Sequence, residues 1–379
     1  MKTEFLSPVP LLDLGAVHAP LAEDLIRDFE RVLRSGQFIL GPEHDAFEKE
    51  LAQFCGVEHA IGVASGTAAL SIALLALGLD PGDEVIVPAF TYFASASSVT
   101  SLGARPVFVD VEPDRMGLDP KKTEAAITPR TRAIMAVHLY GLSSDLAPIL
   151  EIGARRSVPI LEDAAQAIGT RDRGHPVGTQ SAVAALSFFP TKNLGALGDG
   201  GAILTQDEAT ANRARLLRVH GDSGNYTHVA LGTNARLDAL QAAFLRTKLR
   251  RLPEWTEARQ ALAARYRKGL EGVPVGLPPS PRDAVHTYHQ FTIRAPMRDA
   301  LGTYLRERGI ATRIYYPRTV PAQPCFADLG YTPGAYPVSE RLAREVLSLP
   351  IYPGLTMEQV DRVAGEIRSF YEREGGGQE

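Results

Sequence analysis

Short apolar runs alternate with longer amphipathic segments through the first two-thirds of the chain. The runs predict strands, and the segments, whose apolar residues recur at helical spacing, predict helices. Strands are expected at 60–64, 84–88, 105–109, 133–137, 159–162, 184–188 and 201–205. Helices are expected at 67–78, 93–103, 146–156 and 208–219. This alternation favours an α/β fold with a mostly parallel seven-stranded sheet and flanking helices.

A second, smaller unit is expected after the helical segment that runs from Leu237 to about Glu271. Pro253 interrupts that segment, and 379 residues exceed what one hydrophobic core usually supports. We therefore divide the chain into a large domain at 1–250 and a small α+β domain at 251–379. In the small domain, strands are expected near 290–294 and 312–316, and helices at 298–308 and from Thr356 onward. The glycine-rich end of the chain is expected to be disordered.

The composition is that of an ordinary soluble protein, with 45% hydrophobic residues, 22% charged residues and a net charge of −4. The basic stretch Arg246–Arg251 lies on a predicted helix, where a solvated face is the simpler interpretation, so we expect no nucleic-acid partner. Glycines break the charge-free stretch Ala60–Leu79, whose helical part is shorter than the roughly 20 residues that span a bilayer. Two cysteines outside any metal-ligand pattern, and an N-terminus without an apolar signal core, predict a cytoplasmic protein without a metal or a membrane partner.

The most informative chemical pattern is a lysine and an aspartate that follow two different predicted strands. Lys192 ends the run Ser187-Phe-Phe-Pro-Thr-Lys192 and precedes a glycine-rich stretch, and Asp163 ends the apolar run Val158-Pro-Ile-Leu-Glu-Asp163. Pyridoxal 5′-phosphate (PLP) requires such a pair, because a lysine holds its aldehyde as a Schiff base and a carboxylate keeps its ring nitrogen protonated. An isolated lysine is usually a solvated charge, but neighbouring glycines let the backbone approach a bulky ligand. We therefore predict a PLP site with Lys192 and Asp163 as its catalytic residues.

A phosphate site is expected where Ser65-Gly66-Thr67 opens an apolar helix. The free N–H groups and the positive dipole end of a helix start suit a phosphate dianion. The simpler alternative is that Ser65 only caps the helix. Ser187 lies five residues before Lys192, so its hydroxyl is expected to reach the same phosphate.

Two further side chains are candidates for contact with the cofactor ring. Tyr92 follows the strand at 84–88 and would stack on the ring, although an aromatic there is otherwise a core residue. Gln166 would reach the ring hydroxyl, or else make a simple loop hydrogen bond. Asp163 has an alternative role as the cap of a helix that begins at Ala164, and both roles can hold at once.

Together these motifs resemble the DegT/DnrJ/EryC1/StrS family of PLP-dependent sugar aminotransferases, a branch of fold type I. The resemblance runs almost end to end, and the order and spacing of its motifs make a chance match implausible. The motifs are Ser35-Gly-Gln-Phe-Ile-Leu-Gly-Pro42, Ser65-Gly-Thr67, Val137-His-Leu-Tyr-Gly141, Glu162-Asp-Ala-Ala-Gln166, Ser187-Phe-Phe-Pro-Thr-Lys192, His220-Gly221 and Gly232-Thr-Asn-Ala-Arg-Leu-Asp238.

The resemblance implies roles for the cofactor-binding residues. Lys192 would be joined to the PLP aldehyde, Asp163 would partner the ring nitrogen, and Gln166 would contact the ring oxygen. The residues implied at the phosphate are Ser65, Gly66, Thr67 and Ser187. Asn234 would reach the phosphate of the neighbouring subunit's cofactor, which implies a homodimer with shared active sites.

The reaction that the resemblance implies is a transamination in two half-reactions. L-glutamate would give its amino group to the cofactor, leaving pyridoxamine 5′-phosphate (PMP), which would pass the group to a keto group of a nucleotide-linked sugar. The run from Lys192 to Gly201 is similar to members that aminate C3, and C4 is the alternative. Candidates for substrate binding are Arg236, Arg313, Tyr315 and Arg318. Proline stands at position 321, where many relatives have a histidine near the substrate, so an imidazole is not expected to place the sugar here.

Two other functions are compatible with the lysine–aspartate pair. Another fold type I enzyme, such as a cysteine desulfurase, would need a mobile reactive cysteine, and neither Cys55 nor Cys325 lies in a plausible catalytic loop. A non-enzymatic PLP-binding regulator is the second alternative. The absence of a basic patch and of an evident DNA-reading helix pair speaks against it.

Overall fold

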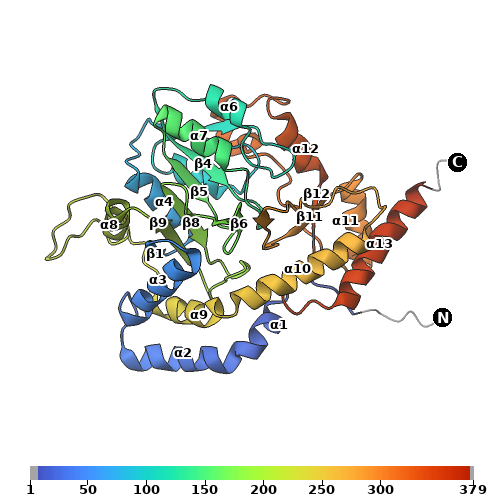
Figure 1. The fold of residues 1–379 in the computed structure, drawn as a ribbon, viewed down its shortest axis with the longest axis horizontal. Helices are drawn as coiled ribbons and strands as arrows, with labels where there is room; N and C mark the ends of the chain where they lie inside the picture. The colour runs from blue at the N-terminus through green and yellow to red at the C-terminus, as the bar shows by residue number, and fades with distance from the viewer. Residues whose placement is uncertain (1–6, 376–379) are drawn as a thin grey trace.

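A seven-stranded sheet forms the core of the larger part of the computed structural model, which describes residues 7–375 (Figure 1). The strand order is β1-β9-β8-β5-β4-β2-β3. The five strands from β8 to β3 in this order pair in parallel, and β9 runs antiparallel to both of its neighbours. The strands are β1 His59–Val63, β2 Glu84–Pro88, β3 Arg105–Val109, β4 Thr131–Val137, β5 Ile160–Asp163, β8 Val183–Ser187 and β9 Gly201–Thr205. All seven predicted strands are present, so the expected α/β fold with a mostly parallel sheet is confirmed.

Helices cover both faces of the sheet, because alternate residues of each strand point to opposite sides. In β4, Met135 and Val137 pack on one side, and Ile134 and Ala136 pack on the other. The first side is covered by α4 Gly66–Ala76, α5 Ala94–Thr100 and α8 Glu208–Leu217. The second side is covered by α3 Pro42–Cys55, α7 Ala147–Arg156 and α9 Ala239–Leu249. The sheet is therefore buried on both faces, as parallel sheets generally are.

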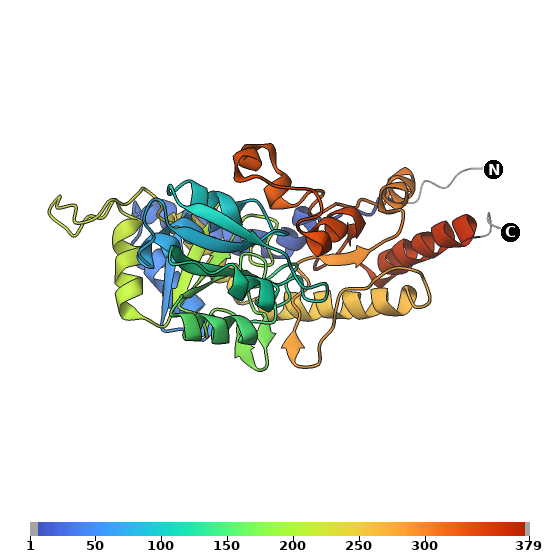
Figure 2. The same ribbon diagram turned by 90° about the horizontal axis from the view of Figure 1, so that it is seen from above.

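A third hydrophobic cluster forms at the other end of the molecule, from the C-terminal part of the chain. Its elements are α10 Leu252–Gly269, β11 Phe291–Arg294, α11 Arg298–Glu307, β12 Val346–Leu349 and α13 Met357–Gly375. Leu252 and Trp255, at the start of α10, pack on the large sheet, whereas Tyr266 packs in the third cluster. Helix α10 therefore runs from one core to the other (Figure 2). The division of the chain at about residue 250 stays a prediction.

Three local expectations differ from the structure. The helical segment is interrupted between α9 and α10 rather than at Pro253, because a proline in the first helical turn gives up no hydrogen bond. The strand expected at 312–316 is wrong, since only one bridge, from Arg313 to Ser348, is formed there. Ile314 packs between two cores, whereas the consecutive residues Tyr315 and Tyr316 both line one cavity, which a strand with alternating side chains does not allow. The expected disordered tail lies outside the described residues beyond α13.

Ten further elements complete the described chain. They are α1 Leu14–His18, η1 Ala19–Leu21, α2 Ala22–Ser35, α6 Pro120–Ala125, β6 Arg171–Asp172, β7 His175–Pro176, β10 Ala284–Val285, η2 Val320–Ala322, η3 Pro324–Leu329 and α12 Pro337–Glu345. Within residues 7–375, no helix combines the length and the apolar character that crossing a bilayer takes.

Residues 219–235, which we call the arm, join α8 to the segment before α9 and project away from the body in both views (Figures 1 and 2). Three apolar side chains on the arm lie in the open, with Tyr226 91%, Val229 61% and Leu231 97% exposed. Helix α2 likewise presents an apolar stripe to the outside, formed by Ile26, Phe29 and Leu33. Exposed apolar side chains that gather on one surface mark sites of contact between proteins, so both surfaces are candidates for contact with another chain.

Candidate active site

A cavity of about 410 Å³ lies beyond the carboxyl ends of the parallel strands, where ligands bind in open α/β sheets. Strands β1, β2, β4, β5 and β8 each end at or shortly before residues that line it. The C-terminal part of the chain closes the other side. The polar and aromatic lining residues are Ser65, Thr67, Thr91, Tyr92, His138, Asp163, Gln166, Ser187, Phe189, Thr191, Lys192, Asp199, His289, Gln290, Tyr315 and Tyr316.

Lys192 lies in a tight loop after β8 that is fastened at several points. The backbone N–H of Lys192 donates to the Phe189 carbonyl (2.8 Å), and that of Ala196 donates to the Phe188 carbonyl (2.7 Å). At Gly195 a Cβ atom would collide with the Pro190 carbonyl, so only glycine allows this curl. The glycine-rich stretch noted in the sequence thus shapes the lysine loop.

A second, fully buried lysine holds the same loop from behind. Lys248 on α9 is 1% exposed, and its Nζ donates to the Gly195 carbonyl (2.8 Å). The same Nζ lies 3.0 Å from Nε2 of His18 on α1. Burial lowers the pKa of the Lys248 amine to about 8. The lysine loop is therefore held by α9, whose Lys248 also contacts α1.

The amine of Lys192 is removed from bulk water although the residue as a whole is half-buried, because its accessible surface opens on the cavity. Burial lowers the pKa of this amine to about 8, against the opposing influence of the Asp163 charge. At pH 7 about a tenth of the lysine is then uncharged and nucleophilic, far more than at the usual pKa of about 10.4. This is the behaviour expected of a Schiff-base lysine rather than of a solvated one.

Asp163 is the last residue of β5 and is 5% exposed. Its Oδ2 accepts a hydrogen bond from the Ser95 hydroxyl (2.7 Å), and its Oδ1 accepts one from the Ala165 backbone N–H (3.2 Å). The chain after Asp163 forms turns, so the carboxylate does not cap a helix there. The helix-cap alternative is therefore wrong, and the carboxylate is left facing the cavity that Lys192 also lines.

The expected phosphate cup is assembled at the start of α4. The Ser65 hydroxyl caps the helix by accepting from the Ala68 N–H (3.1 Å), which leaves the N–H groups of Gly66 and Thr67 without a partner in the described structure. A Cβ atom at Gly66 would lie 2.6 Å from that of Ser187, so Ser187 sits directly against the helix start. Capping and anion binding are thus compatible, since they use different N–H groups.

The two predicted ring contacts both line the cavity and both meet Tyr316. Gln166 donates from Nε2 to the Tyr316 hydroxyl (3.0 Å) and accepts at Oε1 from the Tyr140 N–H (2.8 Å). The Tyr92 ring lies 5.8 Å from that of Tyr316 between centroids, and Tyr92 is 56% exposed. Tyr92 is thus not a core residue. Gln166 does make the loop hydrogen bond that was the alternative to a ring contact.

Four other predicted residues do not line the cavity of the single chain. Asn234 is exposed at the base of the arm and accepts a hydrogen bond from Arg236 Nε (3.0 Å). Arg313 and Arg318 are exposed near Tyr315, which does line the cavity. The predicted roles of these residues stay predictions.

Several cavity residues were not found from the sequence. Thr91 and His138 lie just past β2 and β4, a position that could have marked them. His289 comes from a distant segment, and its Nδ1 lies 3.3 Å from Oδ1 of Asn193, the neighbour of Lys192. Burial, then the nearby Lys192 charge, lowers the pKa of His289 well below its usual value, so its ring is neutral. No local sequence signal connects that segment to the lysine.

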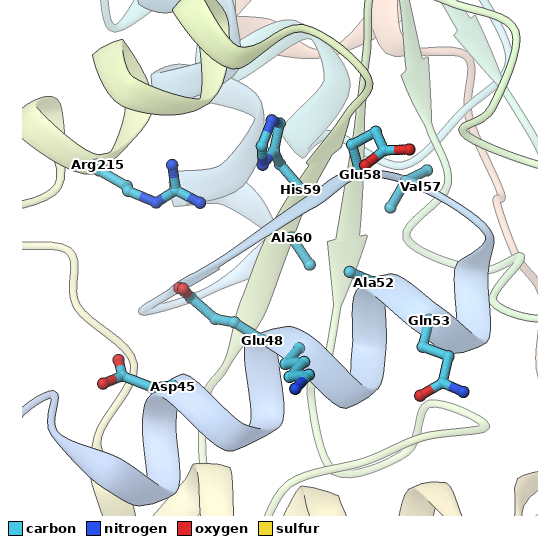
Figure 3. Close-up of a pocket in the computed structure, with 10 residues that line it drawn as sticks. Asp45, Glu48, Ala52, Gln53, Val57, Glu58, His59, Ala60 and Arg215 are labelled. Atoms are coloured by element: carbon cyan, nitrogen blue, oxygen red, sulfur yellow. The ribbon is translucent and has the colours of Figure 1, made fainter.

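A second hollow, of about 520 Å³, shares no lining residue with the cavity of Lys192. Its residues come from α3, from α8, and from β1 with the turn before it (Figure 3). The charged ones are Asp45, Glu48, Lys49, Glu58, His59 and Arg215. Glu48 pairs with Arg218, and Lys49 and Glu58 are exposed. This hollow has no desolvated amine and holds none of the predicted site residues.

The comparison with known proteins agrees with this geometry. Residues 20–368 match the DegT/DnrJ/EryC1/StrS aminotransferase family. The chain belongs to that family. The dTDP-3-amino-3,4,6-trideoxy-alpha-D-glucose transaminase of Streptomyces venezuelae is 48% identical to this aminotransferase over 366 residues, which span 96% of this chain and 97% of that protein. A Geobacillus stearothermophilus protein named pleiotropic regulatory protein is 46% identical over 366 residues, with 96% and 98% of the two chains covered.

Solved structures give the same result. The crystal structure of S. venezuelae DesV in complex with a ketimine intermediate matches this aminotransferase with a TM-score of 0.95 and 47% identity, over 97% of this chain and 100% of that chain. The Bacillus subtilis ntda structure with bound cofactor PMP matches with a TM-score of 0.91 and 34% identity, over 98% and 87% of the two chains. The family resemblance and the aminotransferase fold predicted from the sequence are confirmed.

Proposed function

We propose that this aminotransferase uses PLP to move an amino group from L-glutamate to the C3 keto group of a nucleotide-linked sugar. The observation that carries the proposal is the meeting of three groups in one cavity: the desolvated Lys192 amine, the Asp163 carboxylate and the free N–H groups that open α4. These groups come from segments far apart in the sequence, and each matches a different part of one cofactor.

The residues present fit PLP in charge and in hydrogen bonding. Gly66 and Thr67 offer unpaired N–H groups to a phosphate, and the Ser187 hydroxyl lies beside them. A ring held between this end and Lys192 would meet Asp163 at its nitrogen and Tyr92 at its exposed face. Gln166 retains one amide hydrogen beyond the bond to Tyr316, so it can still donate to a ring oxygen. When bound, PLP supplies an electron sink through which an amino group passes from one carbonyl carbon to another.

The chain itself supplies proton transfer and orientation. Nζ of Lys192 is the group in the cavity that would hold and move a proton, because it is a desolvated amine. Asp163 would stabilise a positive charge at the ring nitrogen of bound PLP. The side chains that line the cavity exclude bulk water from the Lys192 amine. His289 is neutral and adds no competing positive charge beside Lys192.

A nucleotide-linked 3-keto sugar is proposed as acceptor from the sequence run after Lys192 and from the name of the 48% identical transaminase of S. venezuelae. Exposed arginines Arg313 and Arg318, and Arg236 just after the arm of a partner, are the proposed cations for the diphosphate. The C4 position is the alternative acceptor carbon.

A cytoplasmic location is proposed for the protein. It is supported by the free thiols of Cys55 and Cys325.

A homodimer with shared sites is proposed from the surfaces that a single chain leaves open. The arm carries exposed Tyr226 and Leu231, α2 carries exposed Phe29, and Asn234 at the base of the arm does not reach the cavity of its own chain. A second copy would cover these apolar groups and receive Asn234 at its phosphate.

The cofactor and reaction are tested together. Purified protein incubated with PLP should be yellow, and borohydride should fix the label to the peptide that contains Lys192. The absence of label on that peptide would reject the assignment. Initial rates with glutamate and a panel of dTDP- and UDP-linked 3-keto and 4-keto sugars should give ping-pong kinetics and a preference for a 3-keto sugar. A sequential pattern, or preference for a 4-keto sugar, would contradict the scheme or its acceptor carbon.

Shared sites are tested by mixing two inactive variants. Lys192→Ala removes the Schiff-base amine, and Asn234→Asp places a carboxylate where the phosphate of the partner's cofactor would lie, so each variant alone should be inactive. A hybrid dimer has one site with both changes and one site with neither. Random mixing makes half of the dimers hybrid and should restore roughly a quarter of wild-type activity. Mixed protein as inactive as its parents, with hybrid dimers detected by mass spectrometry, would mean that each site is built from one chain.

A regulatory function has one observation in its favour, the name of the 46% identical G. stearothermophilus protein. Retention of a desolvated Lys192 favours catalysis instead. A gel-shift assay with genomic DNA fragments, run beside the transaminase assay on the same preparation, separates the two functions.

A further inference from the structure

A chain of two buried hydroxyls leads to the Asp163 carboxylate. Ser95 on α5 is fully buried, and its Oγ lies 2.7 Å from Asp163 Oδ2. Thr91, which is 2% exposed and also lines the cavity, places its Oγ1 2.9 Å from Ser95 Oγ. Neither residue belongs to the groups assigned above to the cofactor or the substrate.

The direction of these hydrogen bonds follows from the chemistry of the groups. An ionised carboxylate only accepts, so the single hydrogen of Ser95 is committed to Asp163. The Thr91 hydroxyl must then donate to Ser95 Oγ, because Ser95 has no second hydrogen to give. The chain runs one way, from Thr91 through Ser95 to Asp163, and polarises towards the negative charge.

These bonds fix where the carboxylate points. With Ser95 on Oδ2 and the Ala165 N–H on Oδ1, rotation about the last bond of Asp163 would break two hydrogen bonds. Asp163 and Lys192 line one cavity, and the Asp163 charge is felt at the amine. Yet among the ion pairs of residues 7–375, none with an N–O distance within 4.0 Å joins Lys192 to Asp163. An unrestrained carboxylate beside a lysine would be expected to close on it.

We propose that Thr91 and Ser95 are positioning residues that hold the Asp163 carboxylate away from Lys192. The amine is thereby kept free to react with an aldehyde, and the carboxylate is kept aimed at the place of a ring nitrogen. The second half of this statement rests on the proposed function, whereas the first half concerns the chain without its cofactor.

Other titratable groups face Lys192 and bear on any measurement of its amine. Those that line the same cavity are Tyr92, His138, Asp163, Asp199, His289, Tyr315 and Tyr316. A smaller hollow that Lys192 also lines adds His18, Lys248 and Arg259. His138 is tied to Glu162 (2.8 Å) and accepts from the Ser144 N–H (3.1 Å). Asp163 is the member of this set whose orientation the two hydroxyls set directly.

The test follows the reactivity of Lys192 in protein prepared without PLP. Lys192 is methylated with formaldehyde and cyanoborohydride across a pH series, and mass spectrometry of its peptide gives the initial rate at each pH. The midpoint is the pH at which this rate is half of its maximum. Ser95→Ala should move this midpoint upward by about one pH unit, because the freed carboxylate then stabilises the ammonium form. Thr91→Val, which leaves the Ser95 bond in place, should give a smaller upward shift.

Matched variants separate positioning from general damage. Ser98→Ala removes another fully buried hydroxyl of α5, which bonds only to the Ser95 carbonyl (3.3 Å), and should leave the midpoint unchanged. Ser95→Thr keeps the hydroxyl and should restore the wild-type midpoint. An unchanged midpoint in Ser95→Ala, at a thermal stability equal to that of Ser98→Ala, would overturn the proposal. If Ser95→Ala does not fold, an unchanged midpoint in Thr91→Val overturns it instead.

Affinity for PLP gives a second readout. Ser95→Ala should bind PLP about tenfold more weakly than Ser98→Ala, since one hydrogen bond to a charged group is lost. A protein that never binds PLP would defeat the proposed function yet leave the methylation result standing, so the two failures are distinguishable.

Discussion

The two hollows of this chain contain the same kinds of charged side chain in opposite environments. The hollow beside α3 and β1 is the larger, at about 520 Å³ against about 410 Å³ for the cavity of Lys192. Lys49 and Glu58 in the first are exposed to solvent, whereas desolvation lowers the pKa of Lys192 in the second. Volume therefore does not identify the chemical site. The chemical site is identified instead by an amine that is removed from water and has a carboxylate nearby.

The largest effect should come from the two lysines. Lys192→Ala should lower kcat by about 10³-fold or more, because the proton carrier of the reaction is lost, while PLP binding is retained. Lys49→Ala, in the other hollow, should leave kcat and KM unchanged. Steady-state rates and PLP titration of both variants make the measurement. An equal loss of kcat in Lys192→Ala and Lys49→Ala would contradict the assignment of the chemical site to the Lys192 cavity.

The carboxylates should differ in the same sense. Asp163→Asn should reduce kcat by about 100-fold, since a neutral amide cannot hold the charge at the ring nitrogen that a buried carboxylate stabilises. Glu58→Gln in the open hollow is the matched control and should be silent. Full activity of the Asp163→Asn enzyme would contradict the catalytic role proposed for Asp163.

The reactivity of Lys192 should depend on pH in a way that a solvated lysine cannot reproduce. Its amine has a pKa of about 8, so the neutral, nucleophilic fraction rises as pH rises towards that value and levels off above it. Below it, the rate at which PLP-free protein takes up PLP should fall by about tenfold for each pH unit. Stopped-flow absorbance gives the rate. A profile that keeps rising through pH values near the usual lysine pKa would contradict the desolvated environment.

The smallest effect is expected at the phosphate cup. Ser187→Ala removes one hydroxyl beside the start of α4 and should weaken PLP affinity by about fivefold with little change in kcat. Gln53→Ala, which lies in the open hollow, serves as the control. A large loss of kcat in Ser187→Ala would mean that the hydroxyl acts on the reaction rather than on cofactor retention.

Residues and strands with a strong local signal could be predicted from the sequence. Each of the seven strands combines a short apolar run with flanking turn residues, and burial on both faces made those runs continuous. Asp163 ends such a run, and Ser65 and Lys192 follow one within five residues, so their position relative to the sheet was encoded locally.

What could not be predicted depends on contacts between distant segments. His289 and Tyr316 reach the cavity only because the C-terminal part folds back over the ends of the strands. The error at 312–316 has the same origin, since Ile314 is buried by two cores at once rather than by strand pairing. Lys248 looked like a solvated helix charge, and only the packing of α9 against the lysine loop buries it.

The walls of the Lys192 cavity have two sources. Asp163 and Lys192 lie at the carboxyl ends of inner strands, where hydrogen bonds from α5 and α9 hold Asp163 and the lysine loop. Gln290, Tyr315 and Tyr316 come from irregular segments of the C-terminal part. Chemistry and shape are thus borne by separable pieces of the polypeptide. The two sources meet at the His289–Asn193 and Tyr316–Gln166 contacts, so a redesign for another sugar should keep these contacts and vary Gln290 and Tyr315.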